Sequence, residues 1–585
     1  MNVKKTQQTP NKNAETILIL LFFIFLSVFT TAKINGDDDV FWHMENGRYI
    51  TENKVIPSSD VFGFVTSGKE WIPFEWGWDV LSYSVYSIAG YSGVGILRTI
   101  IILFCFFIFV LIVKRAKVNL NLFFLIALLF LFGAQDRLIS KPQIISYLFY
   151  ALLIYIIIDY KYFNRFSFKK IYFLPLIFLV WANMHMGVLV GVVILIMLMV
   201  TEGIDLIKSK QLKLDSVLTS SNKDFLKLTL ICVVSILCLL LNPHGIKTFQ
   251  YVGSHLNMKM MADVFEWRSP FDKIFTSTVY FYVYLIFFGL GVVALYLAYK
   301  MKDNLFQFII VVLMLNSFRA SRFSVDYMIL CLPIIIILLN ILISKSKYKY
   351  FFSARYFSYS LIALFSTLTI LSATNKLYDL MNYPKQTGFG VDERDYPKKM
   401  FGFMKENKID ESIKHPFNSY GCGGYYIWEF KGKKNFIDSR GLNDEIYFDY
   451  KTINNKQPGF ENKIEQFSFD SFIWFFPGLT SNSIELQSSV ISYLIYNSDK
   501  WKLVYWDDNG LLFVKNEEKF REVISKHEYK FVNPLYYIYQ HEPLKKALST
   551  NQQDVIMEVQ RNYKLNPDGM FINSIAKTFK IPVNK

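Results

Sequence analysis

Three consecutive carboxylates, Asp37, Asp38 and Asp39, follow the first long apolar stretch of the sequence. Carboxylates are costly to remove from water, so three together must be solvated, paired with cations or bound to a metal ion. His43 comes four residues after Asp39, which places both on one face of any helix that begins here. Asp37, Asp39 and His43 are therefore candidate catalytic residues, and the two carboxylates are also candidate ligands of a divalent ion. An acidic cap on a helix N-terminus is the alternative interpretation.

Other polar side chains stand near the ends of later apolar runs. Glu75 is a further candidate general base, and His185 is a candidate acid, base or hydrogen-bonding group. Asn183 and His244 are predicted to support them. Because such residues near membrane helix ends line watery cavities or pair with one another, they are functional candidates. A hydrogen-bonded packing histidine is the alternative for His185.

Two pairs of cations have the spacing of neighbours on a helix. Arg137 and Lys141 are four residues apart, and Arg319 and Arg322 are three apart. Arginine binds phosphate oxygens bidentately, so these pairs predict a binding site for the phosphate of a lipid-linked donor. Contact with lipid headgroups, or ion pairs with acids, is the alternative. The expected partners of the second pair are headgroups, a lipid phosphate, Glu75 or the carboxylates of residues 37–39.

The composition indicates an integral membrane protein with a water-soluble part. Of 585 residues, 52% are hydrophobic and 18% aromatic, and only 17 are proline. The net charge of +15 would suggest nucleic acid in a soluble protein, but here the cations cluster in short loops between apolar runs. We therefore predict membrane lipids rather than nucleic acid as partners. Four of the five cysteines lie inside apolar runs, which excludes a disulfide framework.

Eleven apolar runs are candidate membrane helices, each near the roughly 20 residues that cross a bilayer. They cover residues 16–31, 91–113, 119–135, 143–159, 172–184, 187–206, 227–242, 279–299, 304–318, 323–343 and 356–373. Lysine and arginine are concentrated before the first run and in every second loop after it, which predicts a cytoplasmic N-terminus. With an odd number of crossings, the C-terminal region lies outside. The candidate polar residues then all fall on the outer side.

Three regions follow from the change in composition along the chain. Residues 1–374 form a predicted transmembrane domain with an outer loop at 33–78, residues 375–516 an α/β domain, and residues 517–585 a helical tail. Within the α/β domain the patterns predict two strands within 421–438, a strand at 472–476, a helix at 484–496 and a hairpin. The hairpin joins 501–505 to 511–514 through Asn509-Gly510, which accepts the positive φ of a primed turn.

Several short motifs together resemble the GT-C glycosyltransferase superfamily, including the protein mannosyltransferase-like and aminoarabinose-transferase-like enzymes of bacteria. The motifs are Asp37-x-Asp39-Val40-Phe41-Trp42-His43, Phe74-Glu75-Trp76, Lys141-Pro142-Gln143, Trp181-Ala182-Asn183-x-His185-x-Gly187, Asn242-Pro243-His244-Gly245, Gly423-Gly424-Tyr425-x-x-Trp428 and Phe436-x-Asp438-x-Arg440. The resemblance covers most of the chain up to about residue 515. It departs from the family at Lys141, where arginine is usual, and at His244, where tyrosine is more usual.

The resemblance implies a polytopic α-helical membrane protein with a C-terminal extracytoplasmic α/β domain. It also implies a transferase that moves a sugar from a polyprenyl-phosphate-linked donor to an envelope glycan, lipid or protein acceptor outside the cytoplasmic membrane. The acidic motif of the first outer loop would lie at the active site, with a divalent metal ion as a candidate cofactor. The alternatives are a non-catalytic component of envelope polysaccharide assembly or export, and a transporter of lipid-linked sugars.

Overall fold

The computed structural model describes residues 12–164, 167–211 and 221–583, so most of the basic N-terminal tail and parts of two basic loops lie outside the described residues. The described chain divides into two compact units. The first contains the chain up to Ile34, Phe74–Asn257 and Met261–Gly390, and the second contains Asn35–Pro73, Met258–Met260 and the chain from Val391. The predicted outer loop at 33–78 therefore belongs almost entirely to the second unit.

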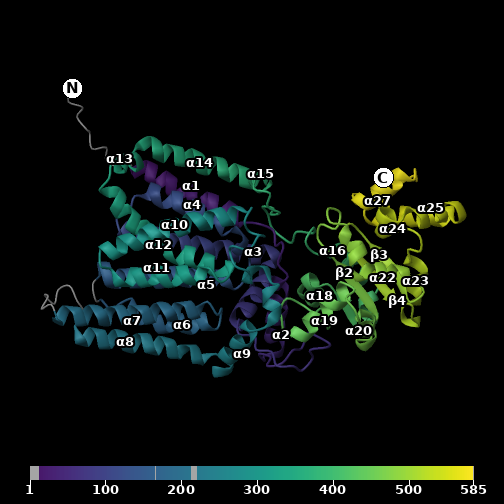
Figure 1. The fold of residues 1–585 in the computed structure, drawn as a ribbon, viewed down its shortest axis with the longest axis horizontal. Coiled ribbons are helices and arrows are strands. Elements are labelled where there is room, and N and C mark those ends of the chain that lie inside the picture. Colours follow the sequence, from purple (N-terminus) through teal and green to yellow (C-terminus); the bar gives the residue numbers. More distant parts are fainter. Residues whose placement is uncertain (1–11, 165–166, 212–220, 584–585) are drawn as a thin grey trace. The chain divides into compact units, whose positions relative to one another are not determined.

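The first unit is a bundle of apolar helices (Figure 1). Eight helices of the described chain are long and apolar enough to cross a membrane, and three shorter apolar helices lie between them. A backbone in lipid must satisfy its own polar groups, so apolar runs of this length form helices. Every predicted apolar run coincides with one of these helices, which confirms the predicted membrane fold class. The longer elements are α1 (Lys12–Thr30), α3 (Trp76–Arg115), α4 (Leu120–Gly133), α5 (Gln143–Ile158), α6 (Leu174–Ala182), α7 (Val188–Gln211), α8 (Asn222–Leu237), α9 (Ile246–Leu256), α10 (Val279–Lys300), α11 (Asn304–Ser317), α12 (Ser321–Ser344) and α14 (Arg355–Ala373).

Short helices complete this unit. They are η1 (Gln135–Arg137), η2 (Asp159–Phe163), η3 (Ile171–Phe173), η4 (Cys238–Leu241), η6 (Phe265–Trp267), α13 (Tyr348–Phe352) and α15 (Lys376–Leu380), and η5 (Lys259–Ala262) lies where the units divide. Helix α1 packs along α14, and α3 packs along α5. The ring centre of Phe22 in α1 lies 5.5 Å from that of Phe365 in α14 and 4.8 Å from that of Phe124 in α4. Helix α3 extends the predicted run at 91–113 toward the N-terminus and is broken at Gly90, whose φ is 59°.

Polar side chains outside the set of candidate residues also gather where α5 and η2 end. Lys161 donates to Glu202 at 2.6 Å and to Asp205 at 3.1 Å, and Lys170 lies 3.0 Å from Asp159. Glu202 and Asp159 are buried. Their charges are paired across helices far apart in sequence, so the sequence alone did not reveal them.

The second unit contains a small sheet covered by helices. Its strands are β1 (Pro416–Asn418), β2 (Ser471–Phe475), β3 (Trp501–Trp506) and β4 (Gly510–Lys515), in the order β1-β2-β4-β3. Strand β1 is parallel to β2, and the other two pairings are antiparallel. The predicted strand at 472–476 and the pairing of the two hairpin strands are thereby confirmed. Asn509 and Gly510 do not have the positive φ predicted for a primed turn, so that part of the prediction was wrong. The helices are α2 (Asp39–Asn53), α16 (Lys398–Glu406), α17 (Ile409–Ser412), η7 (Tyr420–Cys422), α18 (Gly423–Glu429), α19 (Asp444–Asn454), α20 (Phe460–Gln466), α21 (Ile484–Ser488), α22 (Val490–Tyr496), η8 (Glu518–Phe520), α23 (Arg521–His527), α24 (Pro534–Tyr539), α25 (His541–Thr550), α26 (Gln552–Leu565) and α27 (Met570–Thr578).

Two secondary-structure predictions in this unit were wrong. Residues 421–438, predicted as two strands, form η7, α18 and a loop, because a carboxylate binds the first N–H groups of α18. The helix predicted at 484–496 is two helices, since Ser489 is extended and caps α22 by accepting from the Ile491 N–H. The residues after 517 are helical as predicted, and Val555 and Ile572 join the same apolar core as Phe472.

Candidate functional site

In the first unit, the segment that begins with Glu75 is attached to the end of α6. The Trp76 indole donates to Asn183 Oδ1 at 2.8 Å, and the Gly77 N–H donates to the Asn183 carbonyl at 2.9 Å. These bonds hold Glu75 beside His185, with Oε1 3.6 Å from Nε2. The structure thus brings Glu75 next to Asn183 and His185, which follow it by more than a hundred residues in the sequence.

The protonation of His185 follows from its partners. Nδ1 accepts from the Gly187 N–H at 3.0 Å and lies 2.6 Å from Ser146 Oγ of α5. Ser146 accepts from the Trp181 indole at 2.7 Å, which leaves its own proton to donate to Nδ1. With Nδ1 accepting, the ring proton lies on Nε2 and faces Glu75. Nε2 lies 3.6 Å from Glu75 Oε1, so a small movement of either side chain would bring the two groups to hydrogen-bond distance.

Gly187 makes this arrangement possible. A Cβ atom at this position would overlap Ser146 Oγ and lie 2.8 Å from His185 Nδ1. Any side chain would push the ring away from α5. The glycine of the Trp-Ala-Asn-x-His-x-Gly motif is thus explained by the close approach of backbone and histidine.

Two of the four predicted phosphate-binding cations meet at a single carboxylate. Glu266 of η6 forms an ion pair with Arg137 of η1 and lies 3.3 Å from Arg322 Nη1 of α12. The Arg322 guanidinium also covers the Trp267 ring at 4.5 Å from its centre. The spacing predicted Arg137 with Lys141 and Arg319 with Arg322, whereas the tertiary structure joins Arg137 to Arg322. Arg319 is exposed and forms no ion pair with the residues that the structure describes.

Glu266 is a partner of Arg322 that the sequence analysis did not include. Burial raises the pKa of Glu266, but neighbouring cations, Arg137 and Lys141 foremost, outweigh it and hold that pKa well below its usual range. Asp326, one turn after Arg322, also interacts electrostatically with both arginines. Sequence reasoning missed both acids. Asp326 could have been found from the sequence, because an ionisable residue inside an apolar helix is a functional candidate.

Helix α5 connects the histidine and the arginines. Ser146 contacts His185, and the next residue, Tyr147, hydrogen-bonds with Arg137. Two adjacent residues at the N-terminal end of α5 therefore contact the histidine and the arginine cluster, one residue each. Because a helix is rigid over one turn, the two groups are held at a fixed spacing.

His244 lies in a tight turn that packs near this region. Asn242 Oδ1 accepts from the His244 N–H at 3.1 Å and from Thr248 Oγ1 at 3.0 Å, and Gly245 has a φ of 53°. Partial burial lowers the pKa of His244, and Lys247 lowers it further. Asn242 Nδ2 donates to the Ala182 carbonyl at 3.5 Å. The motif therefore positions a turn beside the end of α6.

In the second unit, the three consecutive aspartates have different roles. Asp38 is buried and accepts from the N–H groups of Gly424 and Tyr425, at 2.5 and 2.8 Å, where α18 begins. A Cβ at Gly424 would lie 2.6 Å from the Asp38 carbonyl oxygen, so only glycine allows this contact. Asp38 therefore joins α2 to α18 and matches the capping alternative, but on another helix.

Asp37 and Asp39 remain partly exposed on either side of it. Asp37 Oδ1 accepts from the Asp39 N–H, and Asp39 Oδ1 accepts from the Trp42 indole, each at 3.0 Å. His43 is buried, and its ring centre lies 3.6 Å from that of Trp42. Helix α2 begins at Asp39 and places Asp39 and His43 one turn apart, as the sequence predicts.

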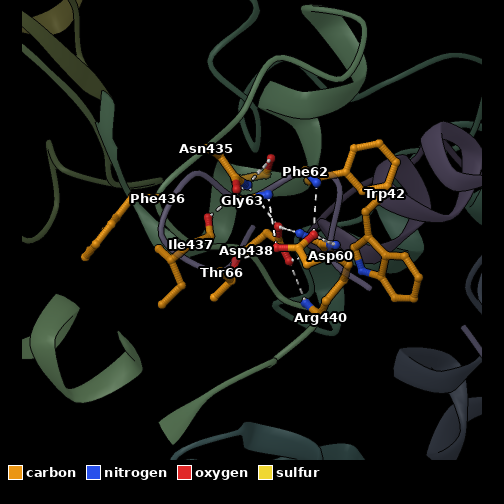
Figure 2. A network of polar contacts seen from close by, with 12 residues as sticks. Trp42, Asp60, Phe62, Gly63, Thr66, Asn435, Phe436, Ile437, Asp438 and Arg440 are labelled. Atoms are coloured by element: carbon orange, nitrogen blue, oxygen red, sulfur yellow. Dashed lines mark hydrogen bonds and ion pairs between the residues drawn. The ribbon is translucent and has the colours of Figure 1, made fainter. Parts of the chain in front are cut away.

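A buried ion-pair network explains the Phe-x-Asp-x-Arg motif (Figure 2). Arg440 donates to both oxygens of Asp438, at 2.8 and 2.7 Å, and to Asp60 at 2.7 Å. All three side chains are at most 2% exposed. The guanidinium also lies 4.7 Å from the centre of the Trp71 ring. Asp60 and Trp71 come from the segment before residue 73, which this network attaches to the loop after α18.

Asp37 and Asp39 are the predicted ligands of a divalent ion. No group of three or more histidine, cysteine, aspartate or glutamate side chains among the described residues is arranged to hold a metal ion. Asp37 and Asp39 supply two carboxylates, and both already accept hydrogen bonds from the protein.

Together, these observations define a polytopic membrane protein with a C-terminal α/β region. Among solved structures, the chain is similar to the archaeal oligosaccharyltransferase AglB from Archaeoglobus fulgidus in complex with an inhibitory peptide and a dolichol-phosphate. The likeness covers 98% of this chain and 87% of that one, at 11% identity and a TM-score of 0.53. A second structure of the A. fulgidus oligosaccharyltransferase, tethered to an acceptor peptide, covers 87% and 74% of the two chains at 11% identity and a TM-score of 0.52.

These structures establish a shared fold, as the resemblance to GT-C enzymes predicted. No protein-family model matches the sequence, and the comparison with curated proteins finds no match. Because folds host many activities, the function must be argued from the site.

Proposed function

We propose that this chain is a glycosyltransferase that moves a sugar from a polyprenyl-phosphate-linked donor to an envelope glycan, lipid or protein acceptor. It would act at the outer face of the cytoplasmic membrane, with the N-terminus inside and the region after residue 375 outside. The observation that carries the proposal is the N-terminal end of α5. There Ser146 contacts His185, the partner of Glu75, and Tyr147 contacts Arg137, one of the two arginines. The oligosaccharyltransferase-like fold supports it.

The arginines supply the electrostatic part of the reaction. Arg137 and Arg322 bind the donor phosphate, and Lys141 and Arg319 add positive charge around it. As the bond between the sugar carbon and the phosphate oxygen breaks, negative charge grows on that oxygen. Cations held in place before the reaction stabilise this charge without reorganising.

The carboxylates supply the base. Glu75 accepts the proton of an acceptor hydroxyl while the hydroxyl oxygen forms a bond with the sugar carbon. His185 stabilises the Glu75 carboxylate through the proton on its Nε2. Asp37 and Asp39 are the second candidate base, or the ligands of a divalent ion. His43 would position Asp39 through the buried turn of α2.

The test is a transfer assay with purified protein, a panel of radiolabelled polyprenyl-phosphate sugars and membrane extract. We expect Glu75→Gln to lower transfer by roughly 10²- to 10⁴-fold, the usual contribution of a general base. The matched control is Glu70→Gln, because Glu70 is an exposed acid. Equal transfer by Glu75→Gln and the wild type would remove Glu75 from the mechanism.

A transporter of lipid-linked sugars is the alternative function, and it would need polar groups near the bilayer midplane. The ion pairs next to α5 lie at its two ends instead. In vesicles with a labelled polyprenyl-phosphate sugar on one side, a transporter moves label across without forming product. A transferase forms product from label supplied on its own side only.

A further inference from the structure

The arginine cluster, defined as Arg137, Arg322 and Glu266, carries more positive than negative charge. Lys141 also interacts electrostatically with Glu266, and two further acids, Asp136 and Asp326, interact with Arg137. Within the cluster itself, two guanidinium groups share the single carboxylate of Glu266.

The guanidinium groups also have unused donors. Arg137 Nε is buried and has no hydrogen-bond partner among the described residues. Arg322 reaches Glu266 through Nη1 at 3.3 Å, which is long for a charge-assisted bond. A guanidinium presents five N–H donors, and one carboxylate can accept only part of what two arginines offer.

The carboxylate of Glu266 can leave while its backbone stays in place. Ser321 Oγ donates to the Glu266 carbonyl at 3.1 Å, and the Ser321 N–H donates to the Arg268 carbonyl at 2.8 Å. These bonds fix the backbone of η6 on α12 and do not involve the Glu266 side chain. That side chain is 23% exposed, so it has a path to solvent by rotation about its own bonds.

We propose that Glu266 is an exchangeable internal anion, which keeps the two arginines apart and oriented until the donor phosphate displaces it. The inference rests on the proposed function, because it takes the arginine pair as the donor site. A phosphate offers more acceptor oxygens and more charge than a carboxylate and can satisfy both guanidinium groups. A ligand with a single carboxylate gains nothing by the exchange. Glu266 would thus set the selectivity of the site for phosphate-bearing lipids.

The experiment measures binding by the full-length protein in detergent, with undecaprenyl monophosphate as the probe. Undecaprenol, which lacks the phosphate, and inorganic phosphate, which lacks the lipid, are the comparison ligands. Glu266→Gln keeps the shape and removes the charge, so we expect the probe to bind about tenfold more tightly, while undecaprenol binding stays the same. The matched control is Glu202→Gln, whose carboxylate pairs with Lys161 beyond the other end of α5.

Unchanged or weaker probe binding by Glu266→Gln would overturn the inference, as would equal tightening toward undecaprenol. Tightening toward inorganic phosphate as well as the probe supports it, because the phosphate is the shared chemistry. Should Glu266→Gln fail to fold, Glu266→Asp keeps the charge and shortens the reach. It is expected to bind the probe more tightly than the wild type, and equal or weaker binding overturns the inference. Binding needs no turnover, so a protein without transfer activity can still give either result.

Discussion

Two arginine–carboxylate clusters, one in each unit, differ in composition and exposure. In the second unit one arginine, Arg440, serves two acids, and every member is at most 2% exposed. In the first unit one acid, Glu266, serves two arginines, and the three side chains are 12 to 23% exposed. The cluster in the second unit is closed to solvent, whereas the cluster in the first unit is partly accessible and has an unused N–H donor on Arg137. The comparison separates an ion pair that holds a fold from one that can bind a ligand.

The largest effect is expected when the buried cluster of Arg440, Asp60 and Asp438 loses its arginine. Arg440→Met leaves Asp60 and Asp438 buried without their cation, which costs about 3 to 5 kcal/mol of unfolding free energy. The exposed pair of Arg394 with Asp392 provides the control, since Arg394→Met removes an arginine whose side chain is 57% exposed. Denaturant unfolding of the full-length protein measures both variants. If Arg440→Met and Arg394→Met were equally stable, Arg440 would not be structural.

The next effect separates neighbouring aspartates. Asp37→Asn is expected to lower transfer by roughly 10²- to 10⁴-fold with normal stability, because the base or metal ligand loses its charge. Asp38→Asn is expected to lower stability by about 1 to 3 kcal/mol instead, since an amide replaces a carboxylate that accepts two N–H bonds. Transfer rates and thermal unfolding of both variants decide. Full activity in Asp37→Asn would leave the acidic run with a capping role alone.

A smaller effect is expected in the arginine cluster of the first unit. Arg322→Lys keeps the charge but loses the planar bidentate fit and the stacking on Trp267, so donor affinity should fall about tenfold. Arg268→Lys is the control, because Arg268 follows Trp267 in the chain and pairs with Asp272. Arg319→Lys should have a smaller effect than Arg322→Lys because Arg319 is exposed. A titration with the donor in which Arg322→Lys matched the wild type would argue for headgroup contact or ion pairing.

The smallest effect concerns a buried cation that donates to backbone carbonyl groups. Lys385 donates to the Phe29 carbonyl at 2.8 Å, and burial, with the charge of Arg98, lowers its pKa to about 7, although Asp136 opposes the shift. The unfolded chain then binds more protons than the folded chain between pH 7 and the usual lysine pKa, so stability rises with pH across that window. We expect a gain of about 1 kcal/mol per pH unit above pH 7. Lys385→Met should abolish this slope, and an identical slope in both proteins would contradict the assignment.

The sequence by itself determined the membrane class, the positions of the apolar helices and the hairpin around Asn509-Gly510. These features depend on local patterns, namely runs of apolar residues and residues that favour turns, so neighbouring residues suffice to predict them. It also identified Glu75, Asn183 and His185 as polar residues of interest. Their contacts could not be read from it because they join segments more than a hundred residues apart.

Only the tertiary structure decided which charges are paired. Spacing predicted partners within a helical turn, yet Arg137 and Arg322 both pair with Glu266, and Arg440 pairs with Asp60. Likewise, residues 421–438 have a strand-like composition but begin a helix because Asp38, nearly four hundred residues earlier, binds its first N–H groups. A buried charge is stable only next to an opposite charge or a hydrogen-bond donor, and in a folded chain the nearest one is set by packing rather than by sequence distance.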